Sequence, residues 1–402
     1  MKIGDLQLVK RINRSVLLRL MRSHPGASRA QLSHLSGLTK STVSSAVREL
    51  IEEGWLEEGL QNENRETHAA QRQGQGRPST PLMLSSKHHA LAGIDLAVDG
   101  LRLAVVSVTG DMLWSEEHAF RAGEKALEPR LVLAQAAQLL RGVRDRLRER
   151  GLQLSGAGLA LPGAMDIKTG MLRIAPNLGW RNVAISTLWF AALAEFGLED
   201  MPTSIQNEAD CAALGEYEFA RLASTDALIF VTCDVGVGAG IVLNDRIYAG
   251  AQGLAGEIGH NILVPGGDLC SCGRRGCAET MIGARALERE CKATGDVTQA
   301  GQALGVLLQN LWTAFNPGQF VMGGKSVMRY PALLKHAKET LASYADAAGM
   351  SPPEIRLARY GFFTSAVGAA ALVLHHQLRP VYADLPWVTS AVQDWRAEPI
   401  AA

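Results

Sequence analysis

One short stretch, Glu257–Glu279, restricts what this chain can fold into more than any other part of it. The stretch contains one histidine and three cysteines among several glycines, with a carboxylate at each end. Three thiolates and one imidazole are a complete ligand set for a tetrahedral zinc ion, and glycines allow the tight loop that gathers them. We therefore predict a structural Zn²⁺ site formed by His260, Cys270, Cys272 and Cys277.

A filled ligand shell leaves no open position on the metal, so Glu257 and Glu279 are expected to remain outside it. A zinc-bound His260 keeps its second ring nitrogen available for a hydroxyl or a carbonyl. Two plainer interpretations stay open. The three thiols could be free in a glycine-rich loop, or the metal could staple the loop without any link to function.

Composition describes an ordinary soluble protein. The 402 residues are 47% hydrophobic and 20% charged, which fits about two to four globular domains. The net charge is zero, but residues 1–50 hold nine Lys/Arg against two Asp/Glu, which predicts a polyanionic partner for that segment. The N-terminus lacks the apolar core of a signal peptide, and no apolar run reaches membrane-spanning length. Six cysteines, three of them in a metal site, favour a cytoplasmic protein without a membrane partner.

Residues 1–70 predict a winged helix-turn-helix domain. Apolar residues from Val9 to Met21 recur at helical spacing and indicate one buried stripe. Ser28 opens a capping-box pattern before a short second helix, and Thr39 can cap a third. A wing strand is expected to begin at 55–57, and the polar segment 71–86 is expected to be a linker.

The outer face of the third predicted helix carries small donors and cations, which suit phosphate and base-edge contacts in a major groove of DNA. An arginine between Gly76 and Pro78 could enter a narrow minor groove, although a plain linker explains that tripeptide equally well. A three-helix protein-interaction module is the alternative for the whole domain. The predicted DNA-binding residues are Arg29, Lys40, Ser41, Thr42, Ser44, Ser45, Arg48 and Arg77.

Residues 86–402 contain two copies of one pattern. Alternating apolar residues and turn dipeptides predict strands over 90–96, 101–108 and 112–118, then a helix over about 126–149 and a strand over 156–161. A similar order begins again with strands over 227–232, 240–244 and 246–248. The repetition predicts two related α/β lobes with a cleft between them, and a helix over 364–377 that packs onto the first lobe or across the hinge.

Several polar residues fall where strands or loops are expected to enter that cleft. Asn207 and Glu208 follow a strand over 203–206, where Asn207 could also be a helix cap and Glu208 a favourable first-turn charge. Together with residues of the predicted metal loop they suit the hydroxyl groups of a polyol. The full set is Asn177, Asn207, Glu208, Glu257, His260 and Glu279.

Almost the whole chain resembles the ROK family of bacterial repressors and sugar kinases. The resemblance rests on ExGH at 257–260, CSCGRRGCAE at 270–279 and NEADCAALGE at 207–216. It implies an actin-like, RNase H-like α/β body whose first lobe is 87–206 plus 364–402 and whose second is 207–363. It also implies an N-terminal winged helix, a homodimer or homotetramer, zinc on the four ligands above, and sugar hydroxyls on the six polar residues.

Departures from the family pattern distinguish a repressor from a kinase. Where ROK kinases have Asp-x-Gly-Gly-Thr near the ATP phosphates, this chain reads DLAVD over 95–99, and the Gly-Thr of the second phosphate loop is replaced by Asp-Val. Each added carboxylate would repel a triphosphate by on the order of a kcal/mol. The kinase general base, an Asp, is Glu208 here, which decides little. The degenerate positions are Ala97, Val98, Asp99, Asp234 and Val235.

We therefore predict a transcriptional repressor, not an enzyme, whose binding to double-stranded operator DNA is modulated by a small sugar between the lobes. Two alternatives remain at this point. One is a ROK sugar kinase that carries a DNA-binding head, and the other is a sugar-independent regulator whose cleft receives a protein or a phosphosugar.

Overall fold

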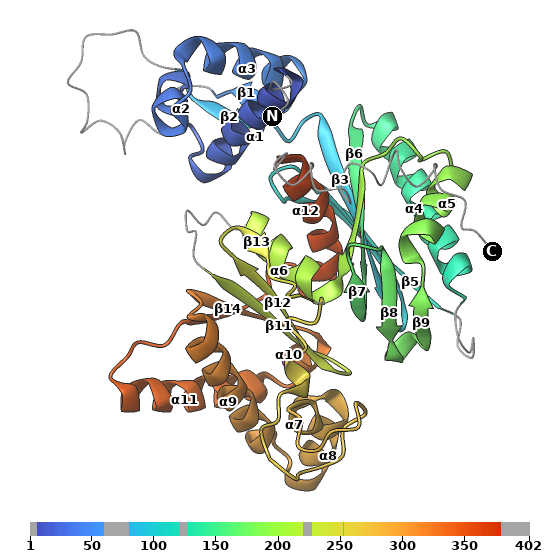
Figure 1. The fold of residues 1–402 in the computed structure, drawn as a ribbon, viewed down its shortest axis with the longest axis vertical. Coiled ribbons are helices and arrows are strands. Elements are labelled where there is room, and N and C mark those ends of the chain that lie inside the picture. Colours follow the sequence, from blue (N-terminus) through green and yellow to red (C-terminus); the bar gives the residue numbers. More distant parts are fainter. Residues whose placement is uncertain (1–5, 60–79, 121–127, 220–226, 252, 379–402) are drawn as a thin grey trace.

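The computed structural model describes residues 6–59, 80–120, 128–219, 227–251 and 253–378. A small helical head adjoins a body of two α/β lobes, and helix α12 lies where the three parts meet (Figure 1). None of the described helices combines the length and the apolar character that crossing a bilayer requires.

The head has the predicted three helices and wing. Ser28 and Gln31 form a reciprocal capping box at the start of α2, and the Thr39 hydroxyl accepts from the Thr42 amide at the start of α3. Leu17, Met21 and their neighbours bury the apolar faces of the helices against one another. The elements are α1 (Leu6–Ser23), α2 (Arg29–Ser36), α3 (Lys40–Glu52), β1 (Leu56–Glu58) and β2 (Leu82–Leu84).

The wing differs from the sequence prediction in one respect. Strand β2 pairs antiparallel with β1, with Leu56 opposite Leu84, although it falls inside the stretch 71–86 that was predicted to be a linker. Three residues are too few for an alternating pattern to stand out, and burial of Leu82 in the head core explains the pairing. Residues 60–79 of the predicted wing tip and linker lie outside the described residues. Val9, predicted to be buried, is 47% exposed.

The first lobe is built on a five-stranded sheet with strand order β10-β6-β3-β4-β5. Strands β3, β4 and β5 are antiparallel neighbours, whereas β6 and β10 run parallel to β3. Helices α4 and α5 pack on this lobe (Figure 1). Its elements are β3 (His89–Ala97), β4 (Gly100–Ser107), β5 (Met112–Ala119), α4 (Pro129–Glu149), β6 (Gln153–Leu161), β7 (Ala164–Asp166), β8 (Met171–Ala175), η2 (Pro176–Leu178), β9 (Trp180–Val183), α5 (Ile185–Glu195) and β10 (Thr203–Asn207).

The second lobe repeats this plan with strand order β13-β12-β11-β14-β15. Three strands again form an antiparallel meander, and β14 and β15 again run parallel to the first of them, which confirms the predicted duplication. Its elements are α6 (Glu208–Phe219), β11 (Leu228–Cys233), β12 (Val237–Leu243), β13 (Arg246–Ile247), η3 (Ile258–His260), α7 (Glu279–Ile282), α8 (Ala284–Thr294), α9 (Thr298–Phe315), β14 (Gln319–Gly323), α10 (Lys325–Arg329), α11 (Pro331–Ala348), β15 (Glu354–Leu357) and η4 (Gly361–Phe363).

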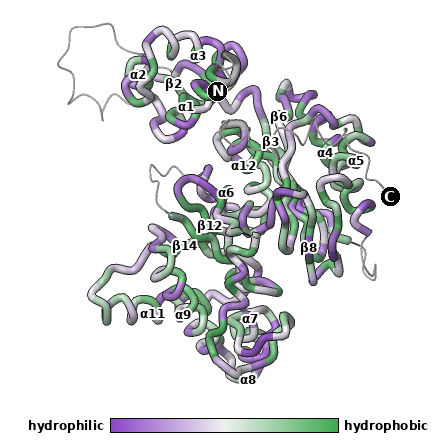
Figure 2. Tube along the Cα trace, in the orientation of Figure 1, coloured by the Kyte–Doolittle hydropathy of each residue, from purple (hydrophilic) through white to green (hydrophobic). Residues whose placement is uncertain are grey.

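Helix α12 (Thr364–Leu378) returns to the first lobe, as predicted. It packs against β3, β6 and α6, so that it also lies at the boundary between the lobes. The hydropathy trace shows hydrophobic residues along β12, β14 and α9, where the second lobe has its core (Figure 2). Burial of these faces in both lobes is the main stabilisation of the body.

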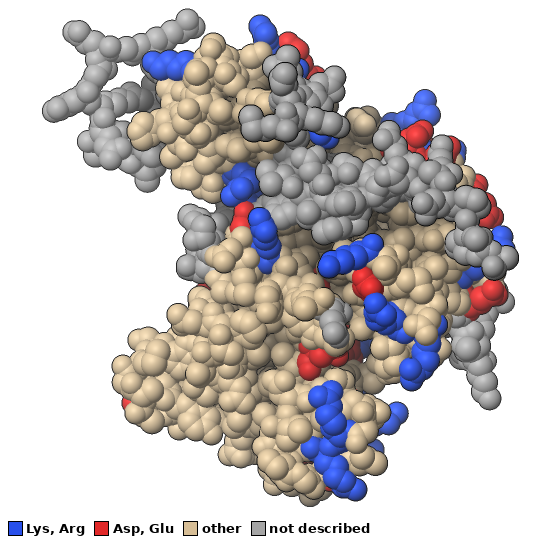
Figure 3. All heavy atoms as spheres, in the orientation of Figure 1, with Lys and Arg blue, Asp and Glu red and all other residues tan. Residues whose placement is uncertain are grey.

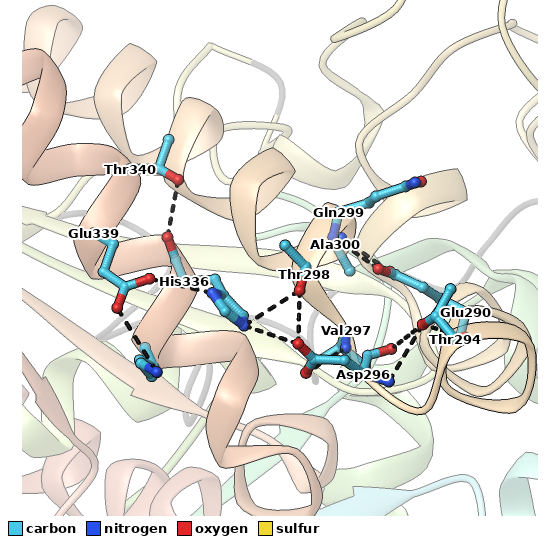
Figure 4. A network of polar contacts seen from close by, with 11 residues as sticks. Glu290, Thr294, Asp296, Val297, Thr298, Gln299, Ala300, His336, Glu339 and Thr340 are labelled. Carbon is cyan, nitrogen blue, oxygen red and sulfur yellow. Dashed lines mark hydrogen bonds and ion pairs between the residues drawn. The ribbon is translucent and has the colours of Figure 1, made fainter.

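A polar network fixes the turn before α9 (Figure 4). Asp296 accepts from Thr298 Oγ1 at 2.6 Å and lies 3.2 Å from His336 Nε2 on α11. The two carboxylate oxygens of Glu290, on α8, accept from the second and third backbone amides of α9 at 2.7 and 3.0 Å. These carboxylates satisfy amides that would otherwise lack partners, so the network connects α8, α9 and α11 into one unit.

Candidate functional site

The predicted metal ligands come together between η3 and α7 of the second lobe. Their four ligand atoms lie within 4.8 Å of one another. Cys270 Sγ lies 3.7 Å from His260 Nδ1, and Cys272 Sγ lies 3.7 Å from Cys277 Sγ. A tetrahedral ion with Zn–S bonds of about 2.3 Å separates its ligands by about 3.8 Å. Both the donor atoms and their spacing therefore fit Zn²⁺.

The loop that carries the three cysteines folds back on itself. Isolated bridges join Ile262 to Cys277 and Leu269 to Arg275. Gly276 has φ 78°, and a Cβ there would lie 1.6 Å from the carbonyl oxygen of Val264. Only glycine allows this close approach, which brings Cys277 to the other ligands.

The metal loop also positions the two carboxylates that flank it. Because His260 Nδ1 faces the thiols, its Nε2 is left toward Glu257, whose Oε2 lies 3.9 Å away. Glu279 begins α7, and its Oε1 accepts from Ser271 Oγ at 3.4 Å. Its Oε2 would be 2.7 Å from a Cβ on Gly236, so Glu279 lies against the loop that precedes β12.

Asn207 has two roles at the end of β10. Its Oδ1 accepts from the amides of Ala209 and Asp210 at 2.8 and 3.3 Å, so the helix-cap interpretation is confirmed. Its Nδ2 donates to the Gly163 carbonyl at 3.1 Å and to Glu208 Oε2 at 2.6 Å. The amide therefore holds the Glu208 carboxylate in place at the start of α6.

Carboxyl groups influence one another strongly around the start of α6. Burial raises the pKa of Glu208 well above its ordinary value, and the charges of Asp95, Glu257 and Asp210 raise it further. Burial also raises the pKa of Glu257, while His260 opposes that shift. Acidic side chains gather between the two lobes on the face drawn in Figure 3. A region of this charge favours a neutral, hydroxyl-rich ligand over an anion.

Asp210 is a member of this group that the sequence did not reveal. It is 6% exposed, and its Oδ1 has no hydrogen-bond partner among the described residues. A carboxylate at this position of a helix can accept from the amide of the cap residue, but Gln206 Oε1 takes the Asn207 amide at 3.0 Å. Burial raises the pKa of Asp210 to about 8, and Glu257 adds to the shift.

Asn177, the remaining predicted sugar ligand, makes no hydrogen bond to the other predicted sugar ligands, all of which the structure describes. It is exposed in the 3-10 turn η2 between β8 and β9 of the first lobe. Its part in binding stays a prediction.

The two loops predicted to be altered, which contain Asp99 and Asp234, lie near one another between the lobes. Asp99, in the turn between β3 and β4, forms an ion pair with Lys325 at the start of α10, so that the pair links the lobes. Arg102 donates to Asp99 at 2.8 Å and to Asp95 at 3.2 Å. Burial raises the pKa of Asp234, and Lys325 and Arg102 oppose that shift. Asp99 thus pairs with both cations, and Asp234 lies close enough for their charges to oppose its pKa shift.

The predicted DNA-binding face of α3 is open to solvent. Val43, Val47 and Leu50 bury the opposite face of the helix in the head core. Thr42 is half-buried because its hydroxyl bonds with that of the cap residue Thr39 at 2.8 Å. The exposed positions are Lys40, Ser41, Ser44, Ser45 and Arg48.

The two other arginines predicted to contact DNA do not belong to this exposed face of α3. Arg29 forms an ion pair of 2.9 Å with Glu58 on β1, so part of its charge is compensated within the head. Arg77 lies outside the described residues.

Comparison with known proteins gives the family. The sequence profile of the ROK family matches residues 91–302, which include the start of α6 and the metal loop. The chain belongs to the ROK family. A winged helix-turn-helix DNA-binding profile matches residues 11–57 of this ROK protein, which run from within α1 through α2 and α3 into β1.

Full-length relatives include named regulators. This ROK protein is 26% identical over 419 residues to the xylose repressor of Caldicellulosiruptor bescii, covering 95% of this chain and 100% of that one. It is 25% identical over 412 residues to the DNA-binding transcriptional dual regulator NagC of Escherichia coli, covering 94% and 96%. The crystal structure of a ROK family transcriptional regulator, a homologue of the E. coli Mlc protein, matches 96% of this chain and 100% of its own with a TM-score of 0.70 at 22% identity. The head and both lobes thus have counterparts in one solved fold.

Proposed function

We infer that this ROK protein is a DNA-binding transcriptional repressor whose affinity for operator DNA depends on a sugar bound between the lobes. One observation carries the inference. A single chain joins an exposed polar and basic helix face in a winged head to a group of carboxyl and amide side chains at the boundary between the lobes. Relatives named as xylose and N-acetylglucosamine repressors cover nearly all of it.

The DNA contacts would come from the exposed face of α3. Small hydroxyl side chains allow the helix to approach base edges, and the cations contact phosphates. A homodimer would place two such helices in successive major grooves of a palindromic operator, and two dimers could form a tetramer. The proposed contacts are Lys40, Ser41, Thr42, Ser44, Ser45 and Arg48, with Arg77 and Arg29 at the edge of the site.

The sugar would lie against the start of α6 and the metal loop. Carboxyl groups, whether ionised or protonated, can accept hydrogen bonds from sugar hydroxyls, and Asn207 and His260 can donate or accept. We propose that a structural zinc ion on His260, Cys270, Cys272 and Cys277 fixes this loop. The metal compensates the thiolate charge, and the loop then holds Glu257 and Glu279 against the ligand. Asn177 would approach from the first lobe.

The carboxylates of the two predicted phosphate loops, Asp99 and Asp234, argue against sugar phosphorylation. The triphosphate of ATP would meet Asp99 and Asp234, and it would have to displace one of them from Lys325 and Arg102. Repulsion by each carboxylate is on the order of a kcal/mol or more, depending on burial. The protein is therefore proposed to have no kinase activity.

Fluorescence anisotropy with the DNA fragment upstream of its own gene tests this function. D-xylose, D-glucose and N-acetylglucosamine are added separately at fixed protein concentration, and one of them is expected to change the apparent operator affinity. A coupled assay with ATP and the same sugars is expected to give no sugar phosphate. Turnover that is abolished by Glu208→Gln would instead identify a kinase with a DNA-binding head. Operator binding indifferent to every sugar, without turnover, would point to a partner protein in the cleft.

A further inference from the structure

Helix α6 connects the proposed sugar site with the DNA-binding head. It begins at Glu208, beside the cap residue Asn207, and it ends at Phe219. Its residues from Ala209 onward are buried along their whole length. At a rise of about 1.5 Å per residue, Glu208 and Glu218 lie about 15 Å apart along the helix axis. A displacement at one end is therefore carried to the other without passing through a flexible loop.

The packing of α6 places it at the boundary between the lobes. A Cβ on Gly240 of β12 would lie 2.0 Å from the Ala209 carbonyl oxygen, so the start of α6 sits directly on the second-lobe sheet. A Cβ on Gly368 of α12 would lie 1.8 Å from the Cys211 carbonyl oxygen, so α6 and α12 also touch through their backbones.

Helix α12 is held by the first lobe in the same way. Cβ atoms on Gly93 and Gly158 would lie 1.8 and 1.9 Å from carbonyl oxygens of α12. Helix α12 is thus packed on the first-lobe sheet, whereas α6 packs on the second-lobe sheet and continues directly from β10 of the first. A closure of the lobes that keeps both sheet contacts would shift α6 against α12, where the two helices meet at glycines.

Three side chains from three parts of the molecule meet at the far end of α6. Glu218 is buried, with a side chain 1% exposed, and it pairs with Arg22 of α1 and with His375 of α12. Arg22 also lies over the Tyr217 ring, 5.6 Å from its centre. We call Arg22, Glu218 and His375 the Glu218 junction. It joins the head, the second-lobe helix and the first-lobe helix at one carboxylate.

A second contact between head and body lies beside the junction. Arg19 of α1 pairs with Asp245 at 3.1 Å, and Asp245 accepts from the Tyr217 hydroxyl at 2.7 Å. Both arginines come from the same helix of the head. These two ion pairs therefore hold α1, and with it α3, in a fixed orientation relative to the end of α6.

We propose that Glu218 is the positioning residue that couples sugar binding to operator binding. This inference rests on the proposed function and specifies the structural path from the sugar site to the DNA-binding head. Sugar at the start of α6 selects one closure of the lobes, the position of α6 against α12 changes, and the Glu218 junction passes that change to α1. A ligand can act in this way only if it binds the two arrangements with different affinity.

The test compares two arginines on one helix. Arg22 and Arg14 have side chains 21% and 22% exposed, but Arg22 pairs with the body whereas Arg14 pairs with Glu53 inside the head. Arg22→Gln removes the ion pair between α1 and Glu218 and leaves Glu218 its histidine partner. Arg22→Lys keeps the charge, and Arg14→Gln is the matched control. Anisotropy gives the ratio of operator dissociation constants with and without each of D-xylose, D-glucose and N-acetylglucosamine.

For wild-type protein this ratio is expected within about 5- to 150-fold, the usual range of allosteric coupling. Arg22→Gln is expected to bring it to within twofold of unity, Arg22→Lys to restore part of it, and Arg14→Gln to leave it unchanged. A merely structural role would weaken binding equally with and without sugar and would leave the ratio intact. An unchanged ratio in Arg22→Gln overturns the inference but not the proposed function. A ratio of unity in wild-type protein for every one of the sugars overturns both.

Discussion

Replacing Asp210 with Asn tests the electrostatics of the proposed sugar site. The native pKa of about 8 lies far above the ordinary 3.8, so between these values the folded protein keeps a proton that the unfolded chain releases. The contribution of this group is therefore fully present below pH 3.8, and stability is lost as pH rises toward 8. The slope is about 1.4 kcal/mol per pH unit. From pH 5 to pH 7 the single group lowers the free energy of unfolding by about 3 kcal/mol.

Asparagine has no proton to lose, so the stability of Asp210→Asn relative to wild type is expected to increase by that amount over the same interval. Urea unfolding of both proteins at pH 5, 6 and 7 measures this difference. Asp200, which is exposed, supplies a control. The free energy of unfolding of Asp200→Asn is expected to change with pH as that of wild type does. The reasoning is refuted if Asp210→Asn also runs parallel within about 0.5 kcal/mol, the usual scale of a neutral surface substitution.

Three further changes test the metal, the DNA face and the hinge. Cys272→Ser is expected to abolish binding of one zinc ion per chain, counted by elemental analysis, and to weaken the sugar response; full zinc content in this variant would contradict the ligand assignment. Arg48→Gln is expected to weaken operator binding and to lower the slope of log K against log salt by about 1, and an unchanged slope would remove it from the phosphate contacts. Gly368→Ala forces a Cβ against the Cys211 carbonyl and is expected to destabilise the body by about 1–3 kcal/mol in urea unfolding, whereas wild-type stability would mean that α6 and α12 are not tightly packed.

The two-lobed body could be predicted because its strands follow local patterns. The predicted strands over 90–96, 101–108 and 112–118 agree with β3, β4 and β5 within one or two residues, since alternation and turn dipeptides are visible in sequence. The metal cluster could also be predicted from the sequence, because its ligands lie close together in the chain and a set of three cysteines and one histidine is typical of zinc. The capping residues Ser28 and Thr39 are local signals of the same kind.

Features that depend on tertiary contacts could not be predicted. Lys325 and Asp99 are 226 residues apart, and nothing in either neighbourhood indicates their pairing. Asp210 resembles any acidic residue in the first turn of a helix until its burial and its orphaned oxygen are known. Strand β2 forms because Leu82 is buried in the head core, and its own sequence shows no alternation of apolar and polar residues.

Helix α6 illustrates the same limit. A helix buried on all sides has no polar face, so its sequence gives no amphipathic period and no sign of which neighbours it contacts. The carboxylate at its far end looks like a surface residue in sequence, yet its side chain is 1% exposed and meets the head.

The central claim is that sugar and operator DNA influence each other through this one chain, and isothermal titration of sugar tests it most directly. The dissociation constant of the responsive sugar is measured for free protein and for protein saturated with the upstream DNA fragment. Thermodynamic linkage requires it to change by the same factor by which that sugar changes the operator affinity. Equal factors are the predicted result. A sugar affinity that is the same with and without DNA would contradict the account.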